Sequence, residues 1–138
     1  MLLECSIKNL AVIESVQVHF SKGFHVLTGE TGAGKSMIID ALSLIIGGRG
    51  SAELVRHGAP KAEIECLFEL DPAHPVWDVL HQYGYEVTED YQLLLRREIT
   101  AQGKSSSRVN DRLANLSLLK AIGEHLVNIH GQHEHQSL

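Results

Sequence analysis

The sequence predicts an α/β fold in which antiparallel strands pack beside one strand–loop–helix unit. Three observations lead to this prediction. Apolar and polar residues alternate in several short segments, which is typical of strands with one buried face. Apolar residues recur at helical spacing through 37–46. A glycine-rich stretch separates that segment from a short β-rich run at 24–28, so the three together predict a strand, a loop and a helix in succession.

The composition is that of an ordinary folded protein with room for one domain. Its 138 residues are 43% hydrophobic and 21% charged. The net charge of -5 argues against a surface that binds nucleic acid throughout, because phosphate neutralisation needs clustered Lys and Arg. Glu4 and Lys8 interrupt the N-terminal apolar residues before a signal-peptide core could form. We therefore expect a cytoplasmic protein without a membrane partner.

The first half of the chain contains the strand–loop–helix unit. Residues 3–8 and 16–20 alternate with period two, and we expect these two strands to pair antiparallel. Residues 21–23 predict a turn, and 24–28 predict a third strand that ends at a glycine. The helix then runs from Lys35 until the glycines at 47 and 48 end it.

The second half adds strands around a hairpin. In order, we expect an exposed loop at 47–60, a strand at 63–70 with its polar side toward water, a break at 71–75, a short helix at 76–83 and a strand at 91–99. Residues 102–105 predict a hairpin loop before a strand at 106–109. Asn115 is placed to cap a helix that runs to about Val127.

The glycine-rich stretch has the pattern G-x-x-x-x-G-K-S at 29–36, which predicts the phosphate-binding P-loop of a P-loop NTPase. Glycines let backbone N–H groups wrap an anion, and the helix N-terminus adds partial positive charge. Lys35 is expected to reach the β- and γ-phosphates, and the Ser36 hydroxyl to bind Mg²⁺. The candidate nucleotide-binding residues are Gly29, Glu30, Thr31, Gly32, Ala33, Gly34, Lys35 and Ser36.

A hydrolytic P-loop site also needs a carboxylate, ordinarily an Asp at the end of a buried apolar strand. Asp71 is the nearest candidate, but Glu63, Glu65 and Glu69 indicate that the strand before it is half exposed. We therefore expect the Walker B carboxylate and the glutamate after it to lie outside residues 1–138. The catalytic residues stay unknown, and we expect this chain alone to be inactive in hydrolysis.

Basic side chains predict local contacts with DNA or with a partner. Residues 96–112 contain five basic residues and two acidic ones, and two more arginines lie in the loop at 47–60. A solvated hairpin face is the alternative interpretation. The candidates for contact are Arg49, Arg56, Arg96, Arg97, Lys104 and Arg108.

Two groups of residues could bind metal or form cross-links. The His-rich tract at 130–136 suggests either a zinc site or a polar loop that serves the nucleotide site, with Gln132 as the contact. Cys5 and Cys66 stand alone in apolar stretches without CxxC spacing. We expect both to be reduced core thiols.

Several segments together resemble bacterial DNA-repair ATPases of the SMC type, within the ABC ATPase superfamily. They are 6–9, 27–36, 47–50, 103–105 with 108–110, and 129–133. The resemblance implies that 1–138 is the N-terminal lobe of an SMC/ABC-type ATPase head, with the coiled coil and C-terminal lobe elsewhere. It implies ATP and Mg²⁺ as cofactors. The implied partners are the C-terminal lobe of the same head, a second head in an ATP-sandwich dimer, and DNA, directly or through other repair proteins.

The resemblance also assigns roles outside the P-loop. Gln132 would occupy the Q-loop, which senses the γ-phosphate and binds the Mg²⁺ ion. Many relatives place this glutamine just before the loop glycine, where this chain has His130, so both residues stay candidates. The implied function is ATP-driven head engagement in recombinational repair of double-strand breaks, at the bacterial nucleoid.

Two other functions fit the P-loop alone. One is a self-contained small P-loop phosphotransferase, but such an enzyme usually begins almost directly at its P-loop strand, whereas here about twenty residues precede it. The other is a non-catalytic interaction module in which the P-loop binds phosphate structurally.

Overall fold

The structure is a computed structural model that describes residues 1–20 and 31–137, with the surroundings of side chains given for 1–20 and 37–126. Its centre is an antiparallel sheet of six strands in the order β2-β1-β3-β4-β5-β6. The strands are β1 (Leu2–Leu10), β2 (Ile13–His19), β3 (Lys61–Glu69), β4 (Gln92–Thr100), β5 (Ser105–Val109) and β6 (Arg112–Ala114).

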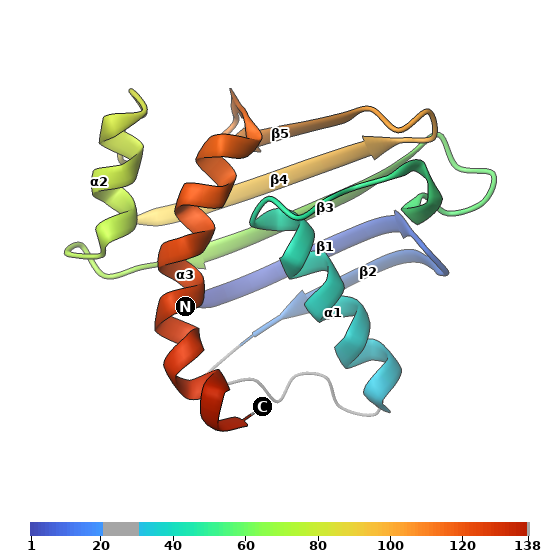
Figure 1. The fold of residues 1–138 in the computed structure, drawn as a ribbon, viewed down its shortest axis with the longest axis horizontal. Coiled ribbons are helices and arrows are strands. Elements are labelled where there is room, and N and C mark those ends of the chain that lie inside the picture. The colour runs from blue at the N-terminus through green and yellow to red at the C-terminus, as the bar shows by residue number, and fades with distance from the viewer. Residues whose placement is uncertain (21–30, 138) are drawn as a thin grey trace.

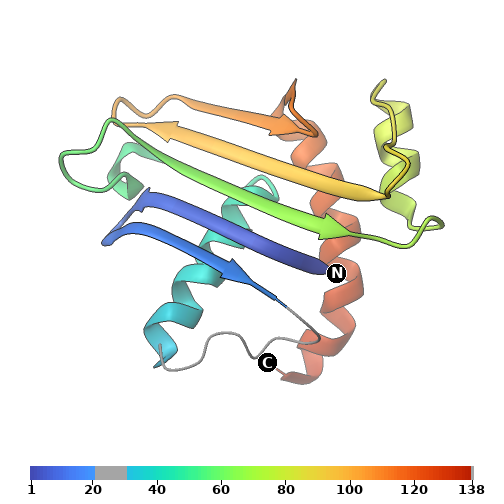
Figure 2. The same cartoon turned by 180° about the vertical axis from the view of Figure 1, so that it is seen from behind.

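The helices leave one face of the sheet open. Helix α1 (Thr31–Ile45) and helix α3 (Leu116–Ser137) lie across the same face, and α2 (Pro75–Gln82) lies beside α3 at one end (Figure 1). The opposite face carries no helix among the described residues (Figure 2). None of these helices is long and apolar enough to cross a lipid bilayer.

The strands predicted from alternation are confirmed. The first two pair antiparallel as expected, with Cys5 opposite Val18 and Ile7 opposite Val16. The strands expected at 63–70, 91–99 and 106–109 match β3, β4 and β5 to within two residues at each end. The strand expected at 24–28 lies outside the described residues.

Strand β6 was not predicted, because it has only three residues. It follows β5 through a two-residue turn, in which Asn110 and Asp111 have φ of 50° and 69°. Two successive positive φ values are typical of a type I′ hairpin turn, and Asn and Asp tolerate them better than most residues. The Asn110 carboxamide oxygen also accepts the Leu94 N–H at 2.8 Å, which attaches the turn to β4.

The helix predictions are confirmed at α2 and over most of α1, which begins at Thr31, four residues before the predicted start, and they are wrong at the end of α3. Asn115 caps α3 as expected, since its Oδ1 accepts the Leu118 N–H at 2.9 Å. The helix continues to Ser137 instead of ending near Val127, so the loop predicted at 130–136 is helical backbone. That segment contains one glycine and no proline, and its His, Gln and Glu residues do not interrupt a helix.

The core lies between the sheet and the two long helices. Alternation on β3 and β4 points every second residue to this side, including Ile64, Phe68 and Leu95. Ile45 of α1 and Ile122 of α3 belong to the same core on the helix side, and both are fully buried. Burial of one such side chain contributes about 1.5–3 kcal/mol, so the shared core holds α1 and α3 against the sheet.

The open face of the sheet is polar, as predicted for the strand at 63–70. Arg96 of β4 contacts Glu63 at 2.8 Å and Glu98 at 3.0 Å, and Lys61 contacts Glu98 at 3.3 Å. All four side chains are between 26% and 40% exposed. Partly exposed pairs of this kind contribute little stability, so the face is a solvated surface.

Candidate nucleotide-binding site

The predicted P-loop coincides with the beginning of α1. Thr31–Ser36 form the first turns of this helix, and its first turn contains no acidic residue. A helix N-terminus presents backbone N–H groups without intrahelical partners, together with partial positive charge. The backbone at this point therefore fits a phosphate group. Gly29 and Glu30 lie outside the described residues, as do the surroundings of the side chains from Thr31 to Ser36.

The other predicted nucleotide contact lies on α3. Gln132 and His130 belong to the C-terminal part of this helix, where only the backbone is described. Figure 1 shows that the N-terminal end of α1 and the C-terminal end of α3 lie at the same lower edge of the molecule. The fold therefore brings the segments of the P-loop and of Gln132 to one side.

The opposite end of α1 is fixed by the glycines at 47 and 48. Gly47 has a φ of 99°, the Gly47 N–H bonds to the Leu44 carbonyl, and the Gly48 N–H bonds to the Ser43 carbonyl at 2.9 Å. This is a Schellman ending of the helix. A Cβ atom at Gly47 would lie 2.6 Å from Cγ of Lys120 on α3. Only glycine fits there, for conformation and for space.

Helix α3 crosses close to this end of α1. A Cβ atom on Gly123 would lie 2.6 Å from Cβ of Ile46, the residue after α1, so Gly123 packs against Ile46 with no room for a side chain of its own. From this crossing the two helices diverge toward the lower edge (Figure 1). The crossing therefore sets the angle between the helices that carry the two candidate segments.

Arg97 of β4 completes the contact at the end of α1. Its side chain is buried among Leu95 and Ile99, and the residue is 1% exposed. Its Nη1 donates to the carbonyl of Leu44 at 2.7 Å and to that of Gly48, and its Nε donates to the Ser105 hydroxyl at 3.2 Å. Burial lowers the pKa of Arg97, but a guanidinium stays charged. It therefore complements the partial negative charge at the helix C-terminus.

The prediction that Arg97 contacts DNA or a partner is wrong. Alternation along β4 places Arg97 on the inner face with Leu93, Leu95 and Ile99, whereas Arg96 lies on the open face. The sequence contained this signal, because position 97 continues the buried series of 93, 95 and 99. The positive charge of Arg97 instead favoured an exposed position.

Three of the other basic candidates gather at one end of the sheet. Lys104 lies in the β4–β5 hairpin, and Arg49 and Arg56 lie in the loop at 47–60. The two segments adjoin, since the Ala101 N–H donates to the Pro60 carbonyl at 2.8 Å. Arg49 and Lys104 are exposed, and Arg56 is half-buried.

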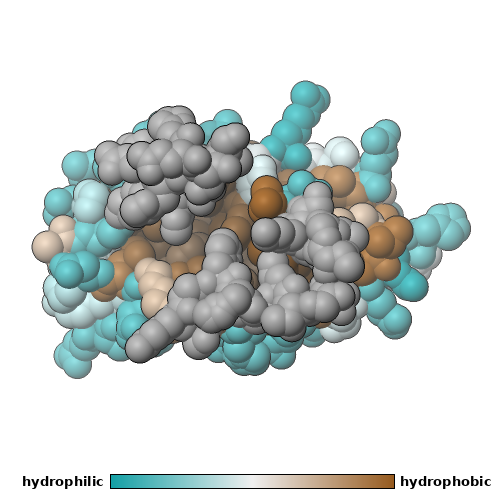
Figure 3. Space-filling model, turned by 90° about the horizontal axis from the view of Figure 1, so that it is seen from below, coloured by the Kyte–Doolittle hydropathy of each residue, from teal (hydrophilic) through white to brown (hydrophobic). Residues whose placement is uncertain are grey.

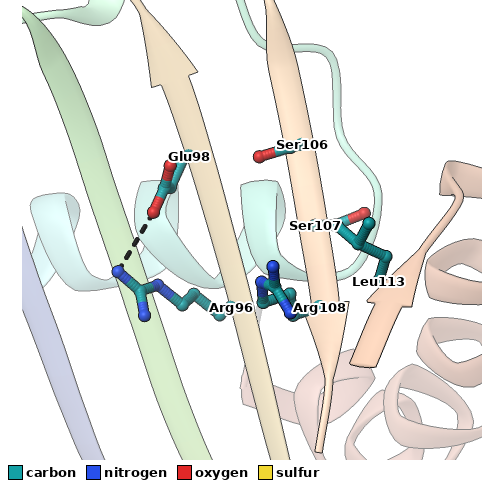
Figure 4. Close-up of a pocket in the computed structure, with 6 residues that line it drawn as sticks. All are labelled: Arg96, Glu98, Ser106, Ser107, Arg108 and Leu113. Atoms are coloured by element: carbon teal, nitrogen blue, oxygen red, sulfur yellow. Dashed lines mark hydrogen bonds and ion pairs between the residues drawn. The ribbon is translucent and has the colours of Figure 1, made fainter. Parts of the chain in front are cut away.

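The remaining two basic candidates lie beside each other on the open face of the sheet. Arg96 is paired with two glutamates there, and Arg108 is exposed. With Glu98 and Ser106 they border a shallow cavity of about 120 Å³, drawn in Figure 4. The Arg108 Nη1 donates to the Asp111 carbonyl at 2.9 Å. Arg96 is therefore less available for an outside contact than Arg108.

The residues considered for catalysis and metal binding are not assembled in the described part of the chain. Asp71 is exposed after the antiparallel strand β3, and its Oδ1 accepts the Ala73 N–H at 2.8 Å. Asp71 therefore does not follow a buried parallel strand, which agrees with the half-exposed strand that the sequence indicated. Within the described residues, no three His, Cys, Asp or Glu side chains gather as a metal site would require. The side chains of the tract at 130–136 lie outside this description.

The two cysteines are free and buried, as predicted, but they are not apart from each other. Cys5 of β1 stands directly opposite Cys66 of β3, and both are 0% exposed. Their Sγ atoms are 2.9 Å apart in a thiol hydrogen bond. That hydrogen bond, together with burial, raises the pKa of the Cys66 thiol. Spacing in the sequence could not show this pairing, because 61 residues separate the two positions.

Comparisons with known proteins place this chain in a family. A family model described as an AAA domain matches residues 4–132. The chain is 56% identical to the DNA repair protein RecN of Halalkalibacterium halodurans and 53% identical to that of Bacillus subtilis. Each match covers 100% of this chain and 24% of the relative. The chain thus spans about a quarter of the length of these curated relatives.

A solved structure supports the same fold. The chain superposes with a TM-score of 0.68 on a protein from work on ATP-driven dimerization and DNA-stimulated activation of SMC ATPases. The two are 27% identical, and the match covers 90% of this chain and 78% of the other. The predicted fold class, with an antiparallel sheet packed beside the P-loop helix, is therefore confirmed.

Proposed function

Because this chain belongs to the AAA domain family, we propose that it is the ATP-binding N-terminal lobe of an SMC-like ATPase head. The head would act in recombinational repair of DNA double-strand breaks, in the cytoplasm at the nucleoid. The observation that carries this proposal is the match over the full chain to the N-terminal quarter of the RecN proteins. The P-loop pattern at the beginning of α1 would bind the phosphates of ATP.

In this proposal the backbone of residues 29–36 binds the triphosphate. The N-terminal N–H groups of α1 would donate to phosphate oxygens, and Lys35 would contact the β- and γ-phosphates. Ser36, together with Gln132 or His130, would hold Mg²⁺, which neutralises charge on the phosphate oxygens during transfer. The carboxylates of hydrolysis would come from the rest of the protein.

Exposed apolar residues near the lower edge of the molecule support coverage by another lobe. Figure 3, which views the molecule from this edge, shows brown apolar surface between the grey atoms. Among the described residues, Ile39 of α1 is 61% exposed and Val16 of the edge strand β2 is 37% exposed. Apolar residues on a helix and an edge strand favour coverage by another part of the protein. We assign this coverage to the C-terminal lobe, and ATP would then join two completed heads.

DNA would contact the end of the sheet where Arg49, Arg56 and Lys104 gather. Their three charges would neutralise a few phosphates locally, although the chain as a whole is acidic. Replacing Arg49 and Lys104 by Ala in the full-length protein should weaken binding to double-stranded DNA and lower its salt dependence. If neither the affinity nor its salt dependence changes, DNA does not bind at this surface.

Calorimetry with Mg²⁺-ATP tests the nucleotide site. The chain should bind ATP, and Lys35→Ala should lose at least about tenfold in affinity, since a charge-assisted bond to phosphate contributes about 1.5–3 kcal/mol. Lys8→Ala is the matched control, because it removes the same charge from an exposed position on the open face. Equal losses in both variants would exclude a specific role for the P-loop. Phosphate transfer to a nucleoside or metabolite would favour the self-contained phosphotransferase.

A further inference from the structure

The buried cysteine pair lies where a covalent bond could form with little movement. Cys5 and Cys66 are direct partners in the antiparallel register of β1 and β3, and their Sγ atoms are 2.9 Å apart. A disulfide needs Cα atoms about 4.4–6.8 Å apart, and directly opposite residues of antiparallel strands are about 4.5–5.5 Å apart. The register therefore already satisfies the spacing requirement.

The surroundings of the pair limit which oxidant could reach it. Both residues are 0% exposed, and their other strand neighbours on the inner face are Val18 and Leu95. A bulky disulfide such as oxidised glutathione has no room to form a mixed disulfide in this core. Hydrogen peroxide is close to water in size, so a small transient opening of the core is enough to admit it.

We propose that Cys5 and Cys66 are a modification site, at which hydrogen peroxide converts the two thiols into a reversible cross-strand disulfide. One cysteine gives up its proton and attacks the peroxide as a thiolate, the O–O bond breaks, and a sulfenic acid and one water form. The second thiol then attacks the sulfenic sulfur, and a second water leaves as the S–S bond forms. In total, two thiols and one hydrogen peroxide give one disulfide and two waters.

The disulfide would enclose the segment that carries the P-loop. The loop closed by residues 5 and 66 contains β2, residues 29–36 and the whole of α1. Closing a loop of this length restricts the unfolded chain, and it also fixes the register of β1 against β3. We therefore expect the oxidised chain to melt at a higher temperature than the reduced chain, by about 5–15 °C.

Mass spectrometry of the folded chain tests the proposal. The chain is exposed to hydrogen peroxide, denatured with an alkylating agent present, and weighed intact and after digestion. We expect a loss of two hydrogens, one cross-linked peptide pair that contains Cys5 and Cys66, and reversal by dithiothreitol. Oxidised glutathione under the same conditions should form the bond at least about tenfold more slowly.

Single-cysteine variants provide the control. Cys5→Ala and Cys66→Ala should show neither the loss of two hydrogens nor a peroxide-dependent rise in melting temperature. The wild-type comparison, with and without dithiothreitol, is decisive even if a variant fails to fold. Oxidation of wild-type chain to sulfinic acid without cross-linking would overturn the proposal. So would a bond that forms only in denaturant or only between two chains.

Discussion

At the scale of single residues, the most informative finding is a charged side chain in the core. Arg97 continues the buried series of β4, and its hydrogen bonds within the described structure go to carbonyl and hydroxyl oxygens. Sequence reasoning placed it on the surface because arginine is almost never buried without a partner. The partner is the C-terminal end of α1, which no local pattern around position 97 reveals.

Removing the Arg97 side chain should therefore destabilise the fold. Arg97→Ala leaves the Leu44 and Gly48 carbonyls without this donor and opens a cavity, so we expect a loss of about 2–4 kcal/mol of unfolding free energy. Arg96→Ala removes two partly exposed ion pairs and should cost no more than about 1 kcal/mol. Urea unfolding measures both. Equal losses would show that the hydrogen bonds from Arg97 to the end of α1 add no measurable stability.

A second residue-scale feature gives the fold a pH dependence. The Nδ1 atom of His74 caps α2 by accepting the Val76 N–H at 3.1 Å, which requires neutral imidazole. Burial, the charged N-terminus and His125 lower the pKa of His74, and Asp71 acts weakly in the opposite direction. Protonation therefore favours the unfolded state. This stabilisation is complete above the unfolded pKa of about 6.5 and declines as pH falls through it toward the lowered folded value.

The variant His74→Asn isolates this effect, because Asn can still cap the helix but does not titrate. Unfolding free energy, measured by urea at several pH values between about 5 and 8, should fall with acid in the wild-type chain. The fall should be smaller in the variant. Parallel profiles in the two proteins would assign the acid sensitivity to other groups.

At the scale of elements, alternation and helical spacing predicted most of the structure correctly. Strands β3 and β4 are recognisable because they have nine residues and one apolar face each. Strand β6 is too short to show a period, and α3 extends through a polar segment whose apolar spacing has ended. The sequence pattern does not show β6 because the turn before it determines its pairing. It does not show the end of α3 because this segment continues the helix that precedes it.

The crossing of α1 and α3 makes a prediction at this scale. Gly123→Ala would place a Cβ atom 2.6 Å from that of Ile46, so the helices must separate. We expect a loss of about 1–3 kcal/mol, as for other overpacked contacts. Glu124→Ala, at an exposed position of the same helix, should change stability by less than about 0.5 kcal/mol. Ile46→Gly removes a partly buried side chain and costs stability of its own, so the double variant Ile46→Gly with Gly123→Ala should lose less than the sum of the two single losses.

Strictly additive losses of stability would argue against a direct contact at this crossing. If the losses are less than additive, the same variants can also test whether the crossing affects ATP binding. The crossing sets the divergence of the helices that carry the P-loop and Gln132, so Gly123→Ala should also weaken ATP binding more than Glu124→Ala does. Calorimetry on folded samples of both variants distinguishes this effect from simple loss of folded protein.

At the scale of the whole molecule, the fold gathers the two candidate nucleotide-binding segments at one edge. The sheet, α1 and α3 bring the P-loop helix and the segment of Gln132 to one edge, where apolar residues are exposed. The sequence identified the P-loop because its chemistry resides in eight consecutive residues. It could not reveal the helix crossing, the partners of Arg97 or the cysteine pair, because these contacts join residues far apart in the chain.

ATP turnover of this chain, alone and mixed with the C-terminal lobe of the 56% identical relative, tests whether a second lobe completes the described edge. Lys35→Ala is the control. We predict turnover only in the mixture, and its loss in the variant. Equal turnover by the chain alone and by the mixture would contradict the account and establish a self-contained enzyme.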